Sequence, residues 1–218
     1  MKTIKLNLTL LAVSIVLISS CSKSLTVGSS EIIEEERSVT DFENVVIEGV
    51  YDTKIIHGDK HGVWVIANDN ILDNINTNVN NKTLKITMDN GAYENINIDL
   101  IITMPTIKEI TKRGVGSTRM EGFYELSTLE INHYGVASFS LEGSVDELSL
   151  NKSGVGSFDA FDLEVEIYVI EQNGIGNTRL TCSKSLSGEL TGIGNIYYKG
   201  QPNIDMDVTG IGRVQDAN

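Results

Sequence analysis

The sequence predicts an all-β fold, a β-solenoid with coils of about 18–21 residues. Two observations support this prediction. A short motif with paired glycines recurs six times from residue 114 onward, and apolar and polar residues alternate between its copies as they do in strands. Self-similarity at a period near 20 residues is typical of a solenoid, because one unit cannot bury its own apolar face and must stack on the next.

The chain begins with the order of a secretory signal. Lys2 and Lys5 precede a mostly apolar stretch, residues 6–18, and two serines then lead into Cys21. This stretch is shorter than the roughly 18 residues that a membrane-spanning helix needs. The string LISSC at residues 17–21 resembles the lipobox of bacterial lipoproteins, which implies cleavage before Cys21 and acylation of that cysteine. The alternative is an ordinary signal peptide with a chance cysteine at its cleavage point.

We therefore expect residues 1–20 to be a lipoprotein signal peptide and residues 21–38 to be the acylated cysteine and a flexible tether, rich in Ser and Glu. Cleavage would leave 15 basic and 30 acidic residues, a net charge of −15. Such a surface repels phosphates, so we expect no nucleic-acid partner and a membrane attachment through Cys21 alone. Cys182 has no histidine near it in sequence and is expected to be an inert, packed thiol.

The repeated corners read GVGS, GVAS, GVGS, GIGN, GIGN and GIGR, and their first glycines lie 21, 19, 20, 18 and 18 residues apart. We expect the glycines to relax the backbone at one corner of each coil. They are Gly114, Gly116, Gly135, Gly154, Gly156, Gly174, Gly176, Gly192, Gly194, Gly210 and Gly212. Each coil should contain at least two short strands, paired in parallel with the next coil at about 4.8 Å.

The earlier half of the chain predicts a less regular continuation of the same sheet. Its expected strands are residues 45–56, 63–67, 83–88 and 96–104, where apolar and polar residues alternate. Residues 68–81 are expected to form one helical turn or a loop packed over the end of the stack. Residues 39–218 together are expected to form one solenoid domain.

The order of these elements, with GIG(N) corners after a lipobox, resembles the auto-transporter adhesin head GIN domain family over roughly residues 39–218. The resemblance implies a right-handed parallel β-helix on an exported protein and a role in adhesion.

Several patterns that suggest chemistry are better explained otherwise. The corners do not open helices as phosphate-binding loops do, and they lack the repeated aspartate of calcium-binding β-rolls. His57 and His61 have the spacing of a zinc pair only on a helix, whereas Gly58 and Gly62 indicate a turn, and His133 stands alone. No two acids at equivalent positions of neighbouring coils face one glycosidic bond, and the alternative is that acids from distant coils converge. We therefore expect no enzyme activity, no cofactor and no metal.

The fifth residue after each first glycine predicts an outer ladder on the surface. Its candidate binding residues are Arg119, Asp159, Arg179 and Tyr197, with Ser140 and Gln215 at the equivalent positions. Asp159 and Arg179 lie one coil apart and could pair. This ladder favours a binding or adhesion module for a glycan or a protein, and the alternative is a structural or assembly component of the envelope without a small-molecule ligand.

The expected location is the cell envelope, where a lipid anchor would hold the protein in the outer membrane. The sequence is compatible with either side of that membrane, the periplasmic face or the outer surface. A last expectation concerns the C-terminal coil, residues 210–218, which is too short to fold back as a cap. Its edge could self-associate or accept a partner strand.

Overall fold

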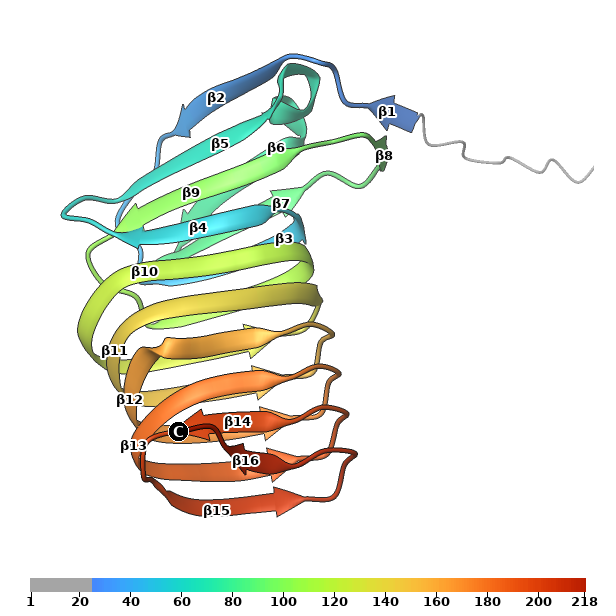
Figure 1. The fold of residues 1–218 in the computed structure, drawn as a ribbon. Helices are drawn as coiled ribbons and strands as arrows, with labels where there is room; N and C mark the ends of the chain where they lie inside the picture. The colour runs from blue at the N-terminus through green and yellow to red at the C-terminus, as the bar shows by residue number, and fades with distance from the viewer. Residues whose placement is uncertain (1–24) are drawn as a thin grey trace, which may run out of the picture.

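The computed structural model describes residues 25–218, in which strands form every element except one short helix (Figure 1). The earlier elements are β1 (Leu25–Val27), β2 (Ile32–Arg37), β3 (Asn44–Val50), β4 (Asp52–His57), β5 (Gly62–Asn68), the 3-10 helix η1 (Asp69–Asn74), β6 (Ile75–Asn80), β7 (Thr83–Met88), β8 (Ala92–Glu94) and β9 (Ile98–Met104). The later elements are β10 (Glu109–His133), β11 (Val136–Lys152), β12 (Phe158–Gln172), β13 (Thr178–Leu190), β14 (Ile196–Lys199), β15 (Asn203–Val208) and β16 (Val214–Asp216). The expected all-β class is confirmed. The expected signal peptide and Cys21 lie outside the described residues.

Strands β10 to β13 stack in parallel, so that equivalent residues of successive repeat units are direct partners. Val115 pairs with Val136, and Phe139 pairs with Phe158. Strands β14, β15 and β16 continue the stack beyond β13. The long strands curve round, and each contributes to two facing layers (Figure 1). The main sheet runs as an open path from β16 to β2.

The core lies between these layers and consists of the inward-pointing residues of each strand. In β12 buried and more exposed residues alternate over most of the strand, as expected for a strand with one face inward. Equivalent core residues stack from unit to unit, and the ring centroids of Phe139 and Phe158 lie 5.6 Å apart. Burying each large apolar side chain contributes roughly 1.5–3 kcal/mol.

The unequal lengths of the repeat units are absorbed on the side away from the glycine corners. Between β10 and β11 the pairing offset is 21 residues at Met120–Leu141 and 19 at Leu126–Val145. The register also shifts between Ser140 and Glu142 in β11. Bulges of this kind bend a strand and re-aim its side chains. The corners themselves therefore stay in register.

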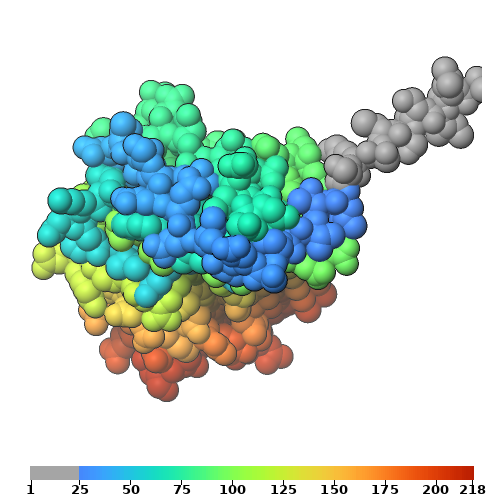
Figure 2. Space-filling view, turned by 90° about the horizontal axis from the view of Figure 1, so that it is seen from above, coloured from blue at the N-terminus to red at the C-terminus, as the bar shows by residue number. Residues whose placement is uncertain are grey.

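The earlier half joins the stack through β3 and β4, which both pair in parallel with β10. Antiparallel pairs then appear, namely β2 with β5, β5 with β9, and β6 with β7. The expected helical turn is present as η1, with Ile71 and Leu72 buried. In the view from above, the blue and green segments lie over the later, yellow to red units (Figure 2). This half therefore covers one end of the stack.

The interpretation of residues 21–38 as a flexible tether is wrong for the described part. Strand β1 pairs with β8, and β2 pairs with β5 along its whole length, from Ile32–Asn68 to Arg37–Val63. The guanidinium of Arg37 also donates to the carbonyl of Leu72, at 2.8 Å. Strand β2 lies at the sheet edge, where backbone pairing holds a strand even when its side chains are mostly exposed and charged. A search for apolar periodicity does not detect such a strand.

The corner glycines are required by close contact between units and by backbone conformation. A Cβ on Gly174 would lie 2.0 Å from the carbonyl oxygen of Gly154 in the preceding unit. Gly176 has a φ of +122°, which L side chains rarely adopt. The amide of Ile175, between them, donates to the carbonyl of Gly154 at 3.0 Å. Only hydrogen fits at the first position, and glycine is favoured at the second.

A ladder of polar side chains is buried inside the first four corners, two residues before the first glycine of each. Lys112, His133, Lys152 and Gln172 occupy these positions and are fully or almost fully buried. The ammonium groups donate to backbone carbonyls, from Lys112 to Tyr51 at 2.8 Å and from Lys152 to Gly176 at 2.7 Å. Burial lowers the pKa of each of these two lysines to about 8. The imidazole of His133 lies between the two lysines in the ladder, and burial together with the charge of Lys152 lowers its pKa to about 4.

We expect Gly176→Ala to destabilise the protein by about 1–3 kcal/mol, because alanine would be strained at this positive φ. Gly174→Val should cost at least as much, since its Cβ would displace the Gly154 carbonyl. Ala137→Gly serves as the control, because Ala137 fills the equivalent corner position without a positive φ. That change should cost under about 1 kcal/mol. Chemical denaturation measures all three, and unchanged midpoints for both glycine variants would contradict the packing argument.

A second prediction concerns acid stability. Because the folded-state pKa of His133 is depressed, the unfolded chain takes up this proton first, and stability falls as pH drops from about 6.5 towards about 4. His133→Gln, which copies Gln172 at the equivalent position, should flatten that part of the profile. Melting temperatures measured between pH 8 and pH 4 test this expectation. Equal slopes for the variant and the wild type would show that His133 is not the titrating group.

Candidate functional site

The predicted outer ladder forms one continuous row on the surface. Arg119 pairs in register with Ser140, Ser140 with Asp159, and Asp159 with Arg179. The row continues through Tyr197 and Gln215. The Arg179 guanidinium lies 3.1 Å from the Asp159 carboxylate. The register therefore brings the predicted residues together, in a row of mixed charge with one aromatic ring.

The neighbouring row, two residues closer to the corner, is largely occupied by contacts between units. The side-chain oxygen of Asn177 accepts from the amide of Asn195 at 2.9 Å, and that of Asn195 accepts from the amide of Arg213 at 3.0 Å. Ser157 donates to Ser138 at 3.2 Å. Oxygens bonded in this way hold the units together and are not arranged as ligands for a cation.

A groove with a volume of about 600 Å³ lies beside the outer row, at the bulges that absorb the unequal unit lengths. The side chain of Tyr124 is exposed over 61% of its surface at the groove. The Phe161 ring lies in the same groove, with the Lys199 ammonium 4.3 Å from its centroid. The other lining residues are Glu142, Gly143, Ser144, Asp162, Glu164 and Thr181. The groove thus combines two aromatic rings with carboxylates and hydroxyl groups.

Ion pairs order the carboxylates that lie between the groove and the N-terminal half. Glu121 contacts Lys54 at 2.6 Å and Arg119 at 2.7 Å. Hydrogen bonds from these two side chains lower the pKa of Glu121. Arg119 also lies 3.9 Å from Glu142. Glu121, held ionised by these contacts, can accept hydrogen bonds from a ligand but is a poor general acid.

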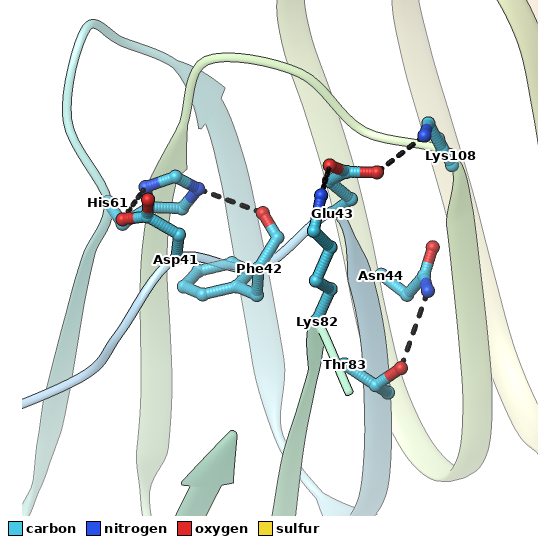
Figure 3. A network of polar contacts seen from close by, with 8 residues as sticks. All are labelled: Asp41, Phe42, Glu43, Asn44, His61, Lys82, Thr83 and Lys108. Carbon is cyan, nitrogen blue, oxygen red and sulfur yellow. Dashed lines mark hydrogen bonds and ion pairs between the residues drawn. The ribbon is translucent and has the colours of Figure 1, made fainter. Parts of the chain in front are cut away.

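A second polar cluster ties the end of the stack together (Figure 3). Glu43 lies 2.5 Å from both Lys82 and Lys108, and their hydrogen bonds lower its pKa to about 2. These residues come from the segment just before β3, the β6–β7 turn and the segment before β10. Asn44 beside them donates to Thr83 at 3.3 Å. The cluster joins three segments of the chain and has a structural role.

The two histidines considered for zinc have separate surroundings. His61 lies 3.2 Å from Asp41 through Nδ1 and 2.8 Å from the Phe42 carbonyl through Nε2 (Figure 3). His57 instead packs edge-on against Phe123, at 5.6 Å between centroids. Among residues 25–218 no group of three His, Cys, Asp or Glu side chains is placed to hold a metal ion. Cys182 is buried, and burial raises the pKa of its thiol.

The structure adds two features that the sequence analysis missed. The buried ladder of Lys112, His133 and Lys152 was missed because such residues usually lie at the surface. The one sequence feature that indicates the ladder is that its three residues share a position, two residues before the first glycine of their corner. The Tyr124 groove was missed because bulges decide which side chains share it. The unequal repeat spacing was the one hint of these bulges.

The comparisons with known proteins agree with the fold. A family model described as "Putative auto-transporter adhesin, head GIN domain" matches residues 41–202. A putative adhesin from Bacteroides fragilis NCTC 9343 is 23% identical and covers 88% of this chain and 99% of its own, with a TM-score of 0.73. No curated protein matches the chain. In the described residues no helix is long and apolar enough to cross a membrane.

Two further solved structures are more distant. A putative adhesin from Parabacteroides merdae ATCC 43184 is 16% identical, covering 89% of this chain and 99% of its own, with a TM-score of 0.51. A putative lipid binding protein from Parabacteroides distasonis ATCC 8503 is 20% identical, covering 89% and 100%, with a TM-score of 0.52. At these identities the likeness concerns the fold alone. The family match spans most of the chain, and the protein therefore belongs to the putative auto-transporter adhesin, head GIN domain family.

Proposed function

We propose that this protein is a non-catalytic binding module of the cell envelope, held there by a lipid on Cys21, and that it binds a glycan or a protein partner. The Tyr124 groove, which opens beside the outer row, is the observation that carries the proposal. An exposed aromatic ring can stack on the apolar face of a sugar. Carboxylates accept hydrogen bonds from the sugar hydroxyl groups, and protein hydroxyls both donate to them and accept from them. The adhesin description of the family supports the same reading.

We further propose that the repeat units form a right-handed parallel β-helix. The parallel, residue-over-residue pairing of β10 to β13 supports it. Right-handedness is the strong preference for crossover connections between parallel strands of one sheet. In this arrangement the groove and the outer row lie on one side of a rigid rod.

A non-catalytic role is favoured by the ion pairs of two acids in and beside the outer row, which lie outside the lining of the groove. Asp159 lies 3.1 Å from Arg179, and Glu121 contacts both Lys54 and Arg119. Glycosidases instead need one carboxyl group with a raised pKa opposite a second carboxylate. An assembly role without a small-molecule ligand is the second candidate, favoured by a row of exposed aliphatic residues along the corners.

The anchor is tested by Cys21→Ala in the native host. Loss of the acylated cysteine should leave an uncleaved precursor or move the protein to the soluble fraction. Cys182→Ala is the matched control, because it removes the other cysteine and should leave the protein bound to membranes. Membrane fractions washed with carbonate and probed by immunoblotting give the answer. Cys21→Ala protein that has the size of the cleaved form and still resists the wash would contradict the lipid anchor.

The binding role is tested by screening the full-length protein, in detergent, against an array of host and bacterial glycans. For a bound glycan, Tyr124→Ala should weaken binding roughly 2- to 13-fold, because one aromatic stacking contact contributes about 0.5–1.5 kcal/mol. Tyr134→Ala removes an exposed tyrosine outside the groove and should bind like the wild type. Glycan binding that is unchanged in Tyr124→Ala would exclude the groove. An array without any binder would exclude the glycans on it and favour a protein partner or the assembly role.

A further inference from the structure

The middle residue of every corner is an exposed aliphatic side chain. These residues form the aliphatic row, which consists of Val50, Val115, Val136, Val155, Ile175, Ile193 and Ile211. Each pairs in register with the next. Their exposed fractions run from 42% at Val155 to 72% at Ile211. Six steps of about 4.8 Å give a continuous apolar ridge about 29 Å long.

The geometry of the corner does not require aliphatic residues at these positions. Close contact and positive φ fall on the glycines, and the middle side chain points into solvent. Threonine is also β-branched and would suit the strand equally well at an exposed site. Threonine does occur nearby, at Thr191 and Thr209, just before two of the corners. Valine or isoleucine at all seven positions therefore indicates a surface that is covered.

The flanks of the row are nearly free of negative charge. None of the 30 acidic residues falls in the six corner segments after Val50, which are residues 112–118, 133–139, 152–158, 172–178, 190–196 and 208–214. Beside Val50 lie two acids that are already bonded, Glu48 to Lys85 and Asp52 to Ser117. The flanking side chains are mainly Ser, Asn and Thr. The Arg113 guanidinium is placed 4.2 Å from the centroid of the Tyr134 ring. On a chain with a net charge of −13, this strip is the place where a second copy meets little repulsion.

We infer that a second copy of this chain packs its aliphatic row against this one. Two identical ridges of the same spacing are self-complementary under two-fold symmetry, and β-branched side chains of one can enter the gaps between rungs of the other. A hollow lined by Ile193, Ile211 and Arg213 lies beside the row and can receive such side chains. A ridge of this length belongs with the smaller interfaces, so a weak dimer, micromolar or weaker, is expected.

Disulfide crosslinking in intact membranes tests this contact. Val155 is the central residue of the row. It would therefore lie next to Val155 of the second copy whether the two rows run parallel or antiparallel. Full-length Val155→Cys should form a covalent dimer under mild oxidation. Val169→Cys, at an exposed aliphatic position between corners, should not. The wild type, oxidised in parallel, controls for Cys21 and Cys182.

The affinity is tested by sedimentation of the full-length protein in density-matched detergent. The double variant Ile175→Lys/Ile193→Lys should raise the dimer dissociation constant at least tenfold and leave the circular dichroism melting curve in place, since both side chains are exposed. Ile167→Lys/Val169→Lys is the matched control and should dimerise like the wild type. Val214→Lys distinguishes this dimer from one formed through the C-terminal edge, because the aliphatic row does not include Val214.

Four results would overturn the inference. The first is a wild-type protein that stays monomeric at high concentration, and the second is equal crosslinking of Val155→Cys and Val169→Cys. The third is flotation of a non-acylated Cys21→Ala protein with vesicles of phosphatidylethanolamine and phosphatidylglycerol that is lost when Ile175→Lys/Ile193→Lys is added. That result would assign the aliphatic row to a membrane surface. Dimerisation lost only in Val214→Lys would likewise assign association to the edge.

Discussion

The close approach of one corner backbone to the next determines the rest of this structure. The carbonyl of Gly154 occupies the space that a side chain on Gly174 would need, and the same carbonyl accepts the amide of Ile175. A hydrogen bond of this kind contributes only about 1 kcal/mol on its own. Repeated at every corner, it fixes the register of all units at once. No unit can slip without breaking contacts on both sides.

This fixed register converts a short repeated motif into three surfaces with different properties. Two residues before the glycine, Lys112, His133 and Lys152 point inward, and the two lysines donate to backbone carbonyls. The residue after the glycine points into solvent and is aliphatic. Four residues further along lies the outer row, where Asp159 pairs with Arg179. The inner ladder holds the corner, and the two outer rows are free for partners.

Much of this arrangement could be predicted because it depends on spacing. The glycine positions, the alternation in β12 and the helical turn before β6 follow from local rules. Strand β2 could not be predicted, since it is held by backbone pairing with β5 and buries little apolar surface. The Tyr124 groove depends on where bulges fall between β10 and β11, and a single sequence does not contain the pairing offset. The buried lysines contradict the usual exposure of their residue type.

The bulges give the two sides of the molecule different tolerance to changes in length. The corner side keeps one register from unit to unit, whereas the number of residues per unit varies on the groove side. At the corners an extra residue would lift a glycine out of contact with its neighbour. On the groove side the offset between β10 and β11 already changes by two residues without disturbing either corner. Insertions and deletions can therefore accumulate around Tyr124 while the stack stays intact. The groove can diversify by changes in loop length, in the way that binding loops diversify on a rigid scaffold.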